Sequence, residues 1–377
     1  MSTTSVLHPE TGPSTHSGHK IEDFRRCPRL YALRHVLGRV QRLSDVGRDA
    51  EAEGGLGART HELVRLSEGL RPGGTVLEVE GDALIKGTLG HQGLACHYLR
   101  QQARNGGLDP GTAAPDPEEG VRALARRKGA HWEVHADLVV ATIRTYQREH
   151  VIDPDGWTPI GVEVELEGRV ALSAGGSSAG GPSVARQLLQ AAGLVDTGGV
   201  VVDCEATARV ATAHPEVNLR VGAPHPGWPH TQRADLVFAQ YDPSGALLGV
   251  GIADHKCVAR PLSGWVVESL LERYELSGQF GGYDWFGSRI PNYRGSWINF
   301  VQWPGKDGLV RFARERTTGR APAASARWEA DQATWFAQRD LLTGLGIPAD
   351  DWPGAWSEYV CRHAYGPCTA AGVCARG

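Results

Sequence analysis

The sequence has no apolar run long enough to cross a bilayer, so we expect no membrane-spanning helix. Residues 1–19 contain no apolar core, which excludes a secretory signal there, and their Ser, Thr and Pro content predicts a disordered leader. No GxxxxGK[ST] motif occurs, so a P-loop motor would have to be a separate chain. The formal net charge of −4 gives no general attraction to nucleic acid, and a DNA-binding surface would be a local patch.

Cysteine is scarce as well, with seven residues in 377. Because nothing indicates secretion, we expect a cytoplasmic protein whose cysteines are metal ligands or free thiols rather than disulfides. The length is enough for one large or two ordinary domains with an ample core. A content of 41% hydrophobic and 22% charged residues is typical of a soluble globular protein.

Residues 233–256 predict a β-hairpin, because two apolar, β-prone runs flank the turn residues 242–245. Asp235 opens the first strand and Asp254 ends the second. Lys256 lies two residues beyond Asp254, so its side chain points to the same face. An antiparallel hairpin brings these ends together, and we therefore expect three charges to converge at one end of a sheet.

Such a convergence of charges has a chemical use. A lone aspartate at a strand end is most often a solvated cap, but a half-buried pair of carboxylates is costly unless a cation neutralises it. Hard oxygen ligands suit Mg²⁺ or Mn²⁺. A lysine beside such an ion can orient a water nucleophile or stabilise the charge that develops on a phosphate oxygen. The hairpin therefore predicts a hard-metal site.

The hairpin carries Asp235 on its first strand and the sequence D-H-K at 254–256 at the end of its second. This arrangement resembles the active-site signature of the PD-(D/E)XK nucleases. It is most similar to their RecB-type exonuclease branch, which includes CRISPR adaptation nucleases and phage exonucleases. The resemblance implies a metal-dependent hydrolysis of phosphodiester bonds in DNA, with single strands or duplex ends as substrate. The implied settings are DNA repair, recombination, phage DNA processing or CRISPR adaptation, in the cytoplasm of a bacterium or a phage-infected host.

The resemblance also implies a fold. We expect an α/β protein with a restriction-endonuclease-like core, in which helices flank a central mixed β-sheet. Residues 20–377 would form a single domain. It would consist of a helical N-terminal part (20–157), a catalytic core (158–320) and a C-terminal helix with an iron–sulfur loop (321–377).

Two helical candidates, at 57–66 and 87–100, each place a histidine after a glycine and match the family's loose G-x-x-x-H helix. The resemblance implies that one histidine completes the metal shell. We prefer His91, because its helix is longer and more apolar, and keep His61 as the alternative.

The strand predicted at 158–172 alternates apolar residues with Glu163 and Glu165. In the family such a strand supplies a glutamate to the site, and Glu163 matches best, with Glu165 and the more distant Glu205 as alternatives. The family has a short connection before the hairpin, whereas this chain has about seventy residues, including the low-complexity run SAGGSSAGGPS. We interpret 173–225 as an insertion.

Residues 263–290 predict one amphipathic helix that carries Gln279 and Tyr283 on the same face, four residues apart. This pair, shortly after D-H-K, resembles the family's QxxxY motif and implies contacts to DNA. The other implied roles follow the same resemblance. Metal ligands would be His91, Asp235, Asp254 and the carbonyl of His255, with Glu163 as a further acidic site residue, and Lys256 would act on the attacking water or the transition state.

Three cysteines, Cys361, Cys368 and Cys374, lie close together at the end of the sequence. Zinc with His363, an iron–sulfur cluster and surface thiols are all compatible with this spacing. The spacing, with Tyr-Gly-Pro before the middle cysteine, resembles the C-terminal loop of RecB-type nucleases that carry a [4Fe–4S] cluster. There the fourth ligand is an early cysteine, which would be Cys27 in D-x-x-x-CPR-x-Y, near a helix start and exposed. Cys96, Cys204 and Cys257 are predicted to be free thiols.

The remaining patterns predict a surface loop at 105–120, one or two helices within 121–150, strands at 297–304 and 309–317, and a helix at 327–346. Two other functions stay open. One is a catalytically inert DNA-binding or scaffold protein that keeps the fold, and the other is a zinc-binding structural protein. A separate helicase or recombination protein is a further expected partner.

Overall fold

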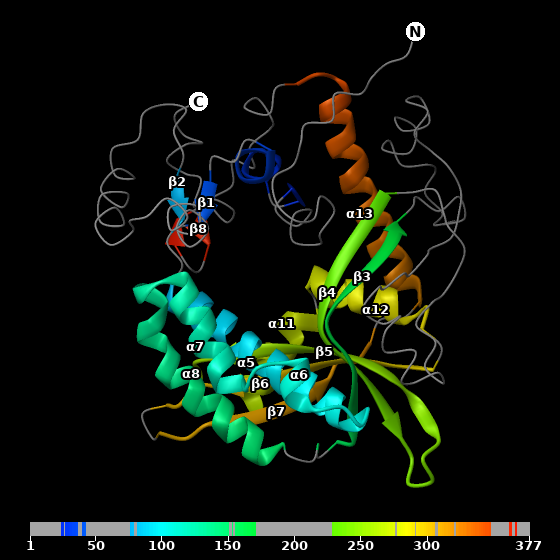
Figure 1. Cartoon of the computed structure of the whole chain (residues 1–377). Coiled ribbons are helices and arrows are strands. Elements are labelled where there is room, and N and C mark those ends of the chain that lie inside the picture. Colours follow the sequence, from blue (N-terminus) through cyan, green and yellow to red (C-terminus); the bar gives the residue numbers. More distant parts are fainter. Residues whose placement is uncertain are drawn as a thin grey trace.

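A computed structural model describes residues 24–25, 27–36, 40–42, 76–78, 81–150, 153, 155–170, 228–275, 277–290, 292–305, 308–319, 322–347, 362–363 and 366–367. This part of the chain is α/β, with a mixed five-stranded sheet covered by helices (Figure 1). The predicted class, a mixed sheet flanked by helices, is confirmed. Within these residues, no helix has the length and apolar character needed to cross a membrane.

The five strands of the sheet lie in the order β3-β4-β5-β6-β7. Only β5 and β6 are parallel, and the other neighbours are antiparallel. A parallel pair needs a crossover, which two helices between β5 and β6 supply. The strand bounds are Trp157–Val170 (β3), Trp228–Tyr241 (β4), Leu247–Val258 (β5), Tyr293–Gln302 (β6) and Arg311–Arg316 (β7).

The aspartates of the hairpin lie inside their strands, not at the strand ends as predicted. β4 and β5 pair from Tyr241–Leu247 to Leu236–Ala253, and Asp235 and Asp254 are the next residues after this last pair. From there β4 continues with β3 alone, and β5 continues with β6. In Figure 1 the β3–β4 ladder rises toward α13, away from the other strands. The two carboxylates therefore lie where the sheet divides.

The continuous segment 81–150 forms α5 (Asp82–Asn105), α6 (Pro110–Ala113), α7 (Pro117–Lys128) and α8 (Ala130–Glu149). The apolar residues of α5, α7 and α8 form one core with Leu236, Phe238 and Ala253 of the sheet. Gly129 separates α7 from α8 with a φ of +98°, which glycine adopts at low cost, so the region predicted as one or two helices is two.

The loop predicted at 105–120 is wrong in part, because α6 and the start of α7 lie within it. Asp109 and Asp116 accept the N–H groups of Gly111 and Glu118, and a proline follows each aspartate. An Asp N-cap followed by Pro at N1 starts a helix even in a turn-rich segment. Asp109 and Asp116, which the sequence pattern assigned to a loop, are therefore helix N-caps.

The second core involves α11 (Gly264–Glu275), α12 (Gly278–Gly287) and α13 (Pro322–Gly344). The single helix predicted over 263–290 is wrong, since α11 ends at Glu275 and Ser277 caps α12 by accepting the N–H of Phe280. After this break, α12 contacts β4 and β5.

The remaining described elements are short. They are α2 (Pro28–Tyr31), the π-helix η1 (Ala32–Val36), the parallel pair β1 (Val40–Arg42) and β2 (Val76–Glu78), and the antiparallel pair β8 (Arg362–His363) and β9 (Gly366–Pro367).

Candidate active site

Asp235 is the centre of the site. Its side chain is buried between β5 and α5, and its Oδ2 accepts the backbone N–H of His255 at 2.6 Å. The same oxygen lies 3.3 Å from Nδ1 of His91, which α5 supplies. Burial alone would raise the pKa of Asp235, but His91, His255 and Lys256 lower it well below the usual range. Asp235 is therefore a buried carboxylate that keeps its charge.

Glu163 lies across from Asp235 on the neighbouring strand, because Val162 pairs with Leu236 and Val164 with Ala234. Its backbone has a φ of +53°, a conformation that residues with a Cβ rarely adopt. Burial, and then the charge of Asp235, raise the pKa of Glu163 to about 7. Two carboxylates facing each other across a ladder destabilise it unless a cation lies between them.

His91, Glu163 and Asp235 fit a divalent cation. One ligand atom of each can be chosen so that all of them lie within 4.8 Å of one another. Two carboxylates and one imidazole give mostly oxygen ligands, as Mg²⁺ and Mn²⁺ prefer. Burial would lower the pKa of His91, but Asp235 raises it to about 9, so a proton competes with any metal for this nitrogen.

Asp254 has a different set of partners. Its Oδ2 lies 2.5 Å from Nζ of Lys256, and its Oδ1 accepts from Nε2 of Gln279 at 2.6 Å and from the hydroxyl of Tyr283 at 2.9 Å. Burial raises the pKa of Asp254, although Lys256 opposes this shift. The carboxylate thus holds three side chains of the predicted site together.

Lys256 is a cation in this arrangement. Burial would lower the pKa of its ammonium group, but Asp254 and Asp235 raise it above the ordinary value. Nζ also donates to Oε1 of Gln279 at 3.0 Å and lies 5.2 Å from the ring centre of Tyr274. A permanently charged lysine stabilises negative charge and orients polar groups, whereas it cannot act as a general base.

Gln279 and Tyr283 come from α12, one turn apart, and Nε2 of Gln279 also lies 2.9 Å from the hydroxyl of Tyr283. The same hydroxyl lies 2.8 Å from the backbone oxygen of Arg233, so its single proton is shared between this oxygen and Asp254. Burial and Asp254 raise the pKa of Tyr283 well above its usual value, so it stays protonated. Both side chains close the space that β4 and β5 leave where they separate.

His255 lies between two site residues, but its ring is buried in the core with Asn299 and Tyr98. Burial lowers the pKa of His255 to about 3, so the imidazole is neutral. Its backbone N–H contributes to the site through Asp235. Whether its carbonyl ligates a metal stays a prediction.

The structure brings together all predicted site side chains that it describes: His91, Glu163, Asp235, Asp254, Lys256, Gln279 and Tyr283. Glu165 lies two residues further along β3, opposite Arg233 in the ladder. His61, Glu205 and the insertion at 173–225 lie outside the described residues.

The predicted cluster ligands Cys361, Cys368 and Cys374 also lie outside the described residues. Cys27 is the N-cap of α2, and its Sγ accepts the N–H of Leu30 at 3.4 Å. The prediction of an exposed Cys27 is wrong, since it is 7% exposed. Its place at a helix start is confirmed.

Two further residues near the site were missed from the sequence. Arg233 is the more exposed, with Nε 3.7 Å from Oε2 of Glu163, and Gln232 donates to the backbone oxygen of Gln279. They lie three and two residues before Asp235, at and just before the start of the hairpin predicted at 233–256. A strand extended by a few residues would have included them.

No family model, curated protein or solved structure matches the chain. The assignment of a function therefore depends on the residues of the site and on their geometry.

Proposed function

We propose that this protein is a metal-dependent DNA nuclease with a PD-(D/E)XK core of the RecB-like exonuclease kind. One observation carries the proposal: side chains from α5, β3, β4, β5 and α12, in the order of the family's motifs, converge where β4 and β5 separate. Each motif alone is common in proteins. Their convergence around buried carboxylates supports a shared chemical task.

His91, Glu163 and Asp235 would hold Mg²⁺ or Mn²⁺, with Asp254 and the carbonyl of His255 as further proposed ligands. When bound, the ion would polarise a phosphate oxygen and make water more acidic. The carboxylate of Asp235 is already charged and tied to the backbone of His255, so the main ligand is held in place before binding.

Lys256 would stabilise the negative charge that develops on the phosphate during hydrolysis. Asp254 and Gln279 fix its ammonium group, which reduces the reorganisation needed in the reaction. Gln279 and Tyr283 would then contact the DNA strand, exchanging hydrogen bonds to Asp254 for bonds to the substrate.

The proposal includes the cofactor and partners that the resemblance implies. A [4Fe–4S] cluster would be held by Cys27, Cys361, Cys368 and Cys374 and would join distant parts of the chain. DNA, as single strands or duplex ends, is the proposed substrate, and a separate helicase or recombination protein is the proposed partner. The cytoplasm is the proposed location.

A cleavage assay tests the function. Labelled single- and double-stranded DNA would be incubated with the protein and Mg²⁺ or Mn²⁺. We expect Lys256→Ala to lose at least about 100-fold in rate, the scale of a lost electrostatic contact in a transition state. Lys86→Ala, which removes a surface ion pair on α5, is the control and keeps the wild-type rate. Equal rates for Lys256→Ala and wild type would refute the proposal.

A second candidate is an inert DNA-binding protein that keeps this core. It is favoured by the carboxylate of Asp254, whose two oxygens already have protein partners in Lys256, Gln279 and Tyr283. Binding of labelled DNA without any metal-dependent product, under the conditions of the cleavage assay, would identify this second function.

A further inference from the structure

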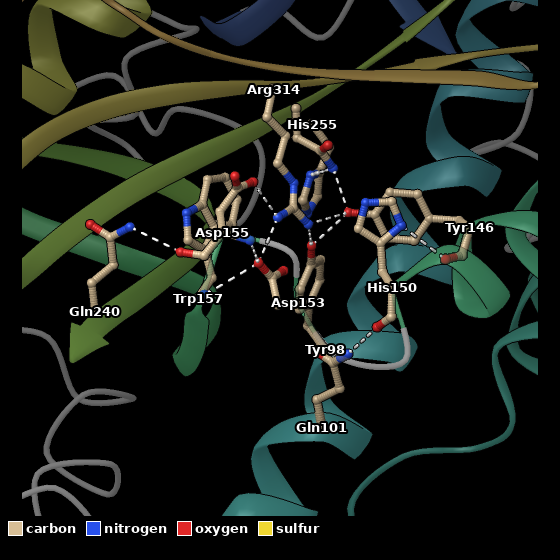
Figure 2. Close-up of polar contacts among 11 residues, drawn as sticks. Tyr98, Gln101, Tyr146, His150, Asp153, Asp155, Trp157, Gln240, His255 and Arg314 are labelled. Carbon is tan, nitrogen blue, oxygen red and sulfur yellow. Dashed lines mark hydrogen bonds and ion pairs between the residues drawn. The ribbon is translucent and has the colours of Figure 1, made fainter. Parts of the chain in front are cut away.

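A buried polar network lies next to the site, on the face of the sheet that α5 and α8 cover (Figure 2). Arg314 of β7 is at its centre, with only 7% of its side chain exposed. Its Nη1 lies 2.7 Å from Oδ1 of Asp153 and 2.9 Å from Oδ2 of Asp155, and the guanidinium stacks on Trp157 at 4.1 Å. A buried cation is costly unless it is paired, and the two aspartates pair Nη1 of this one, whereas its Nε has no hydrogen-bond partner among the described residues.

The other half of the guanidinium holds two tyrosine hydroxyls. Nη2 of Arg314 donates to Tyr98 and to Tyr146, both at 3.0 Å, and the hydroxyls lie 2.6 Å apart. Asn299 of β6 donates from Nδ2 to Tyr146 at 2.9 Å. One cation thus connects two helices that cover the same face of the sheet, since Tyr98 belongs to α5 and Tyr146 to α8.

The network reaches β5 through Asn299. Its Nδ2 lies 2.9 Å from Nδ1 of His255, and because an amide nitrogen only donates, this ring nitrogen accepts. Asn299 pairs with His255 on one side and with Arg314 on the other, so the three form a row across β5, β6 and β7. The ring of Tyr98 stacks on the imidazole, with 5.4 Å between centroids and 5° between planes.

Two elements of the candidate site, α5 and β5, therefore each contribute a residue to the same network. On β5, His255 lies between Asp254 and Lys256 and donates its backbone N–H to Asp235. On α5, Tyr98 lies seven residues, or about two turns, after His91 and so on the same face. Fixing these two residues fixes the distance between His91 and the carboxylates.

We propose that Arg314, Asn299 and Tyr146 are positioning residues for the metal site. They hold the β5 backbone through the ring of His255 and the α5 helix through the hydroxyl of Tyr98. The proposal rests on the proposed function in one respect, since it takes His91 and Asp235 as metal ligands.

The test uses Tyr146→Phe, which removes one hydroxyl with little change in volume. Its control is Ile143→Val, a loss of one buried methylene group on the same helix with no polar partner. Two quantities are measured on the full chain: the Mn²⁺ dissociation constant by calorimetric titration, and hydrogen exchange of the His255 amide by NMR without metal. We expect Tyr146→Phe to weaken Mn²⁺ binding by about 10–100-fold, the usual effect of losing support for a ligand, and to speed the exchange of this amide.

Ile143→Val should match wild type in both measurements. If Tyr146→Phe behaves as this control does, the network is merely structural and the positioning role is refuted. Tyr98→Phe provides a second variant should Tyr146→Phe fail to fold. A wild type that binds no Mn²⁺ refutes the metal site and the proposed function, whereas the exchange of the His255 amide decides the positioning role without any metal.

Discussion

Glu163 has a backbone φ of +53° in the middle of a strand, opposite a buried aspartate. Each feature costs free energy: the left-handed conformation because of its Cβ, and the facing carboxylates because of their charge. Both features therefore lower the stability of the fold. In the proposed function, a divalent cation bound by Glu163 and Asp235 would offset the cost of the facing charges.

Two substitutions at Glu163 separate strain from charge. Both Glu163→Ala and Glu163→Gly remove the carboxylate, but only glycine relieves the positive φ. We expect Glu163→Gly to be more stable than Glu163→Ala by about 1 kcal/mol in urea unfolding with EDTA. In an unstrained strand the order is reversed, since glycine there is the less stable by roughly 0.5–1 kcal/mol, and that order would contradict the strain.

Buried histidines predict how stability depends on pH. Burial lowers the pKa of His97 to about 3 and, together with Arg314, that of His150 to about 4. Below the ordinary histidine pKa of about 6.5 the unfolded chain binds protons that the folded chain does not, so stability falls as the pH falls toward these values. The loss per histidine is at most about 1.4 kcal/mol per pH unit.

Urea unfolding between pH 7 and pH 4.5 measures this dependence. His97→Gln should reduce the slope of stability against pH by the contribution of up to one proton. An unchanged slope in His97→Gln would show that this histidine is charged in the fold.

At the scale of elements, α12 lies very close to its neighbours. A Cβ at Gly281 would strike the indole of Trp328, and one at Gly282 would strike the amide of Gln232, which donates to the backbone of Gln279. Gly281 therefore lets α12 approach α13, and Gly282 lets it approach β4. Their close packing is what places both polar side chains on Asp254.

A pair of Gly→Ala variants tests this approach. Gly282→Ala should destabilise the fold by about 1–3 kcal/mol, because the added methyl group displaces Gln232. Gly87→Ala, in α5 where no atom lies within 4 Å of the new Cβ, should stabilise by about 0.5–1 kcal/mol. Denaturant unfolding measures the stability of both variants. An equal change in the free energy of unfolding for Gly282→Ala and Gly87→Ala would contradict a tight contact at α12.

At the scale of the whole molecule, local patterns predicted most of the elements. The strands at 158–172, 297–304 and 309–317 and the helix at 327–346 are confirmed as β3, β6, β7 and α13 with shifted ends. The caps at Asp116 and Ser277 were missed, because the same residue types also form turns.

The geometry of the site was less predictable. Asp235 and Asp254 were expected at strand ends, opposite the turn of the hairpin, but they lie where β4 leaves β5 for β3 alone. That division of the sheet depends on packing between residues far apart in sequence. The network of Arg314 has no local signature for the same reason, since its members come from α5, α8, β5, β6 and β7 and from the segment before β3.

Metal binding should stabilise the whole fold, because the three ligands come from α5, β3 and β4. At a free Mn²⁺ concentration 100 times its dissociation constant, we expect about 2.7 kcal/mol of added stability and a higher melting temperature. Asp235→Asn should lose this shift, since it removes the central charge. A thermal shift of equal size in both proteins would place the ion elsewhere.

The most direct test of the central claim is the release of nucleotides from labelled DNA by wild type and Asp235→Asn, with Mn²⁺ and with EDTA. The site described above predicts cleavage by the wild type in Mn²⁺ alone and a loss of at least about 100-fold in Asp235→Asn. Asp137→Asn, on the exposed face of α8, should cleave at the wild-type rate. Cleavage that persists in EDTA, or equal rates in Asp235→Asn and wild type, would contradict a metal-dependent nuclease at this junction of the sheet.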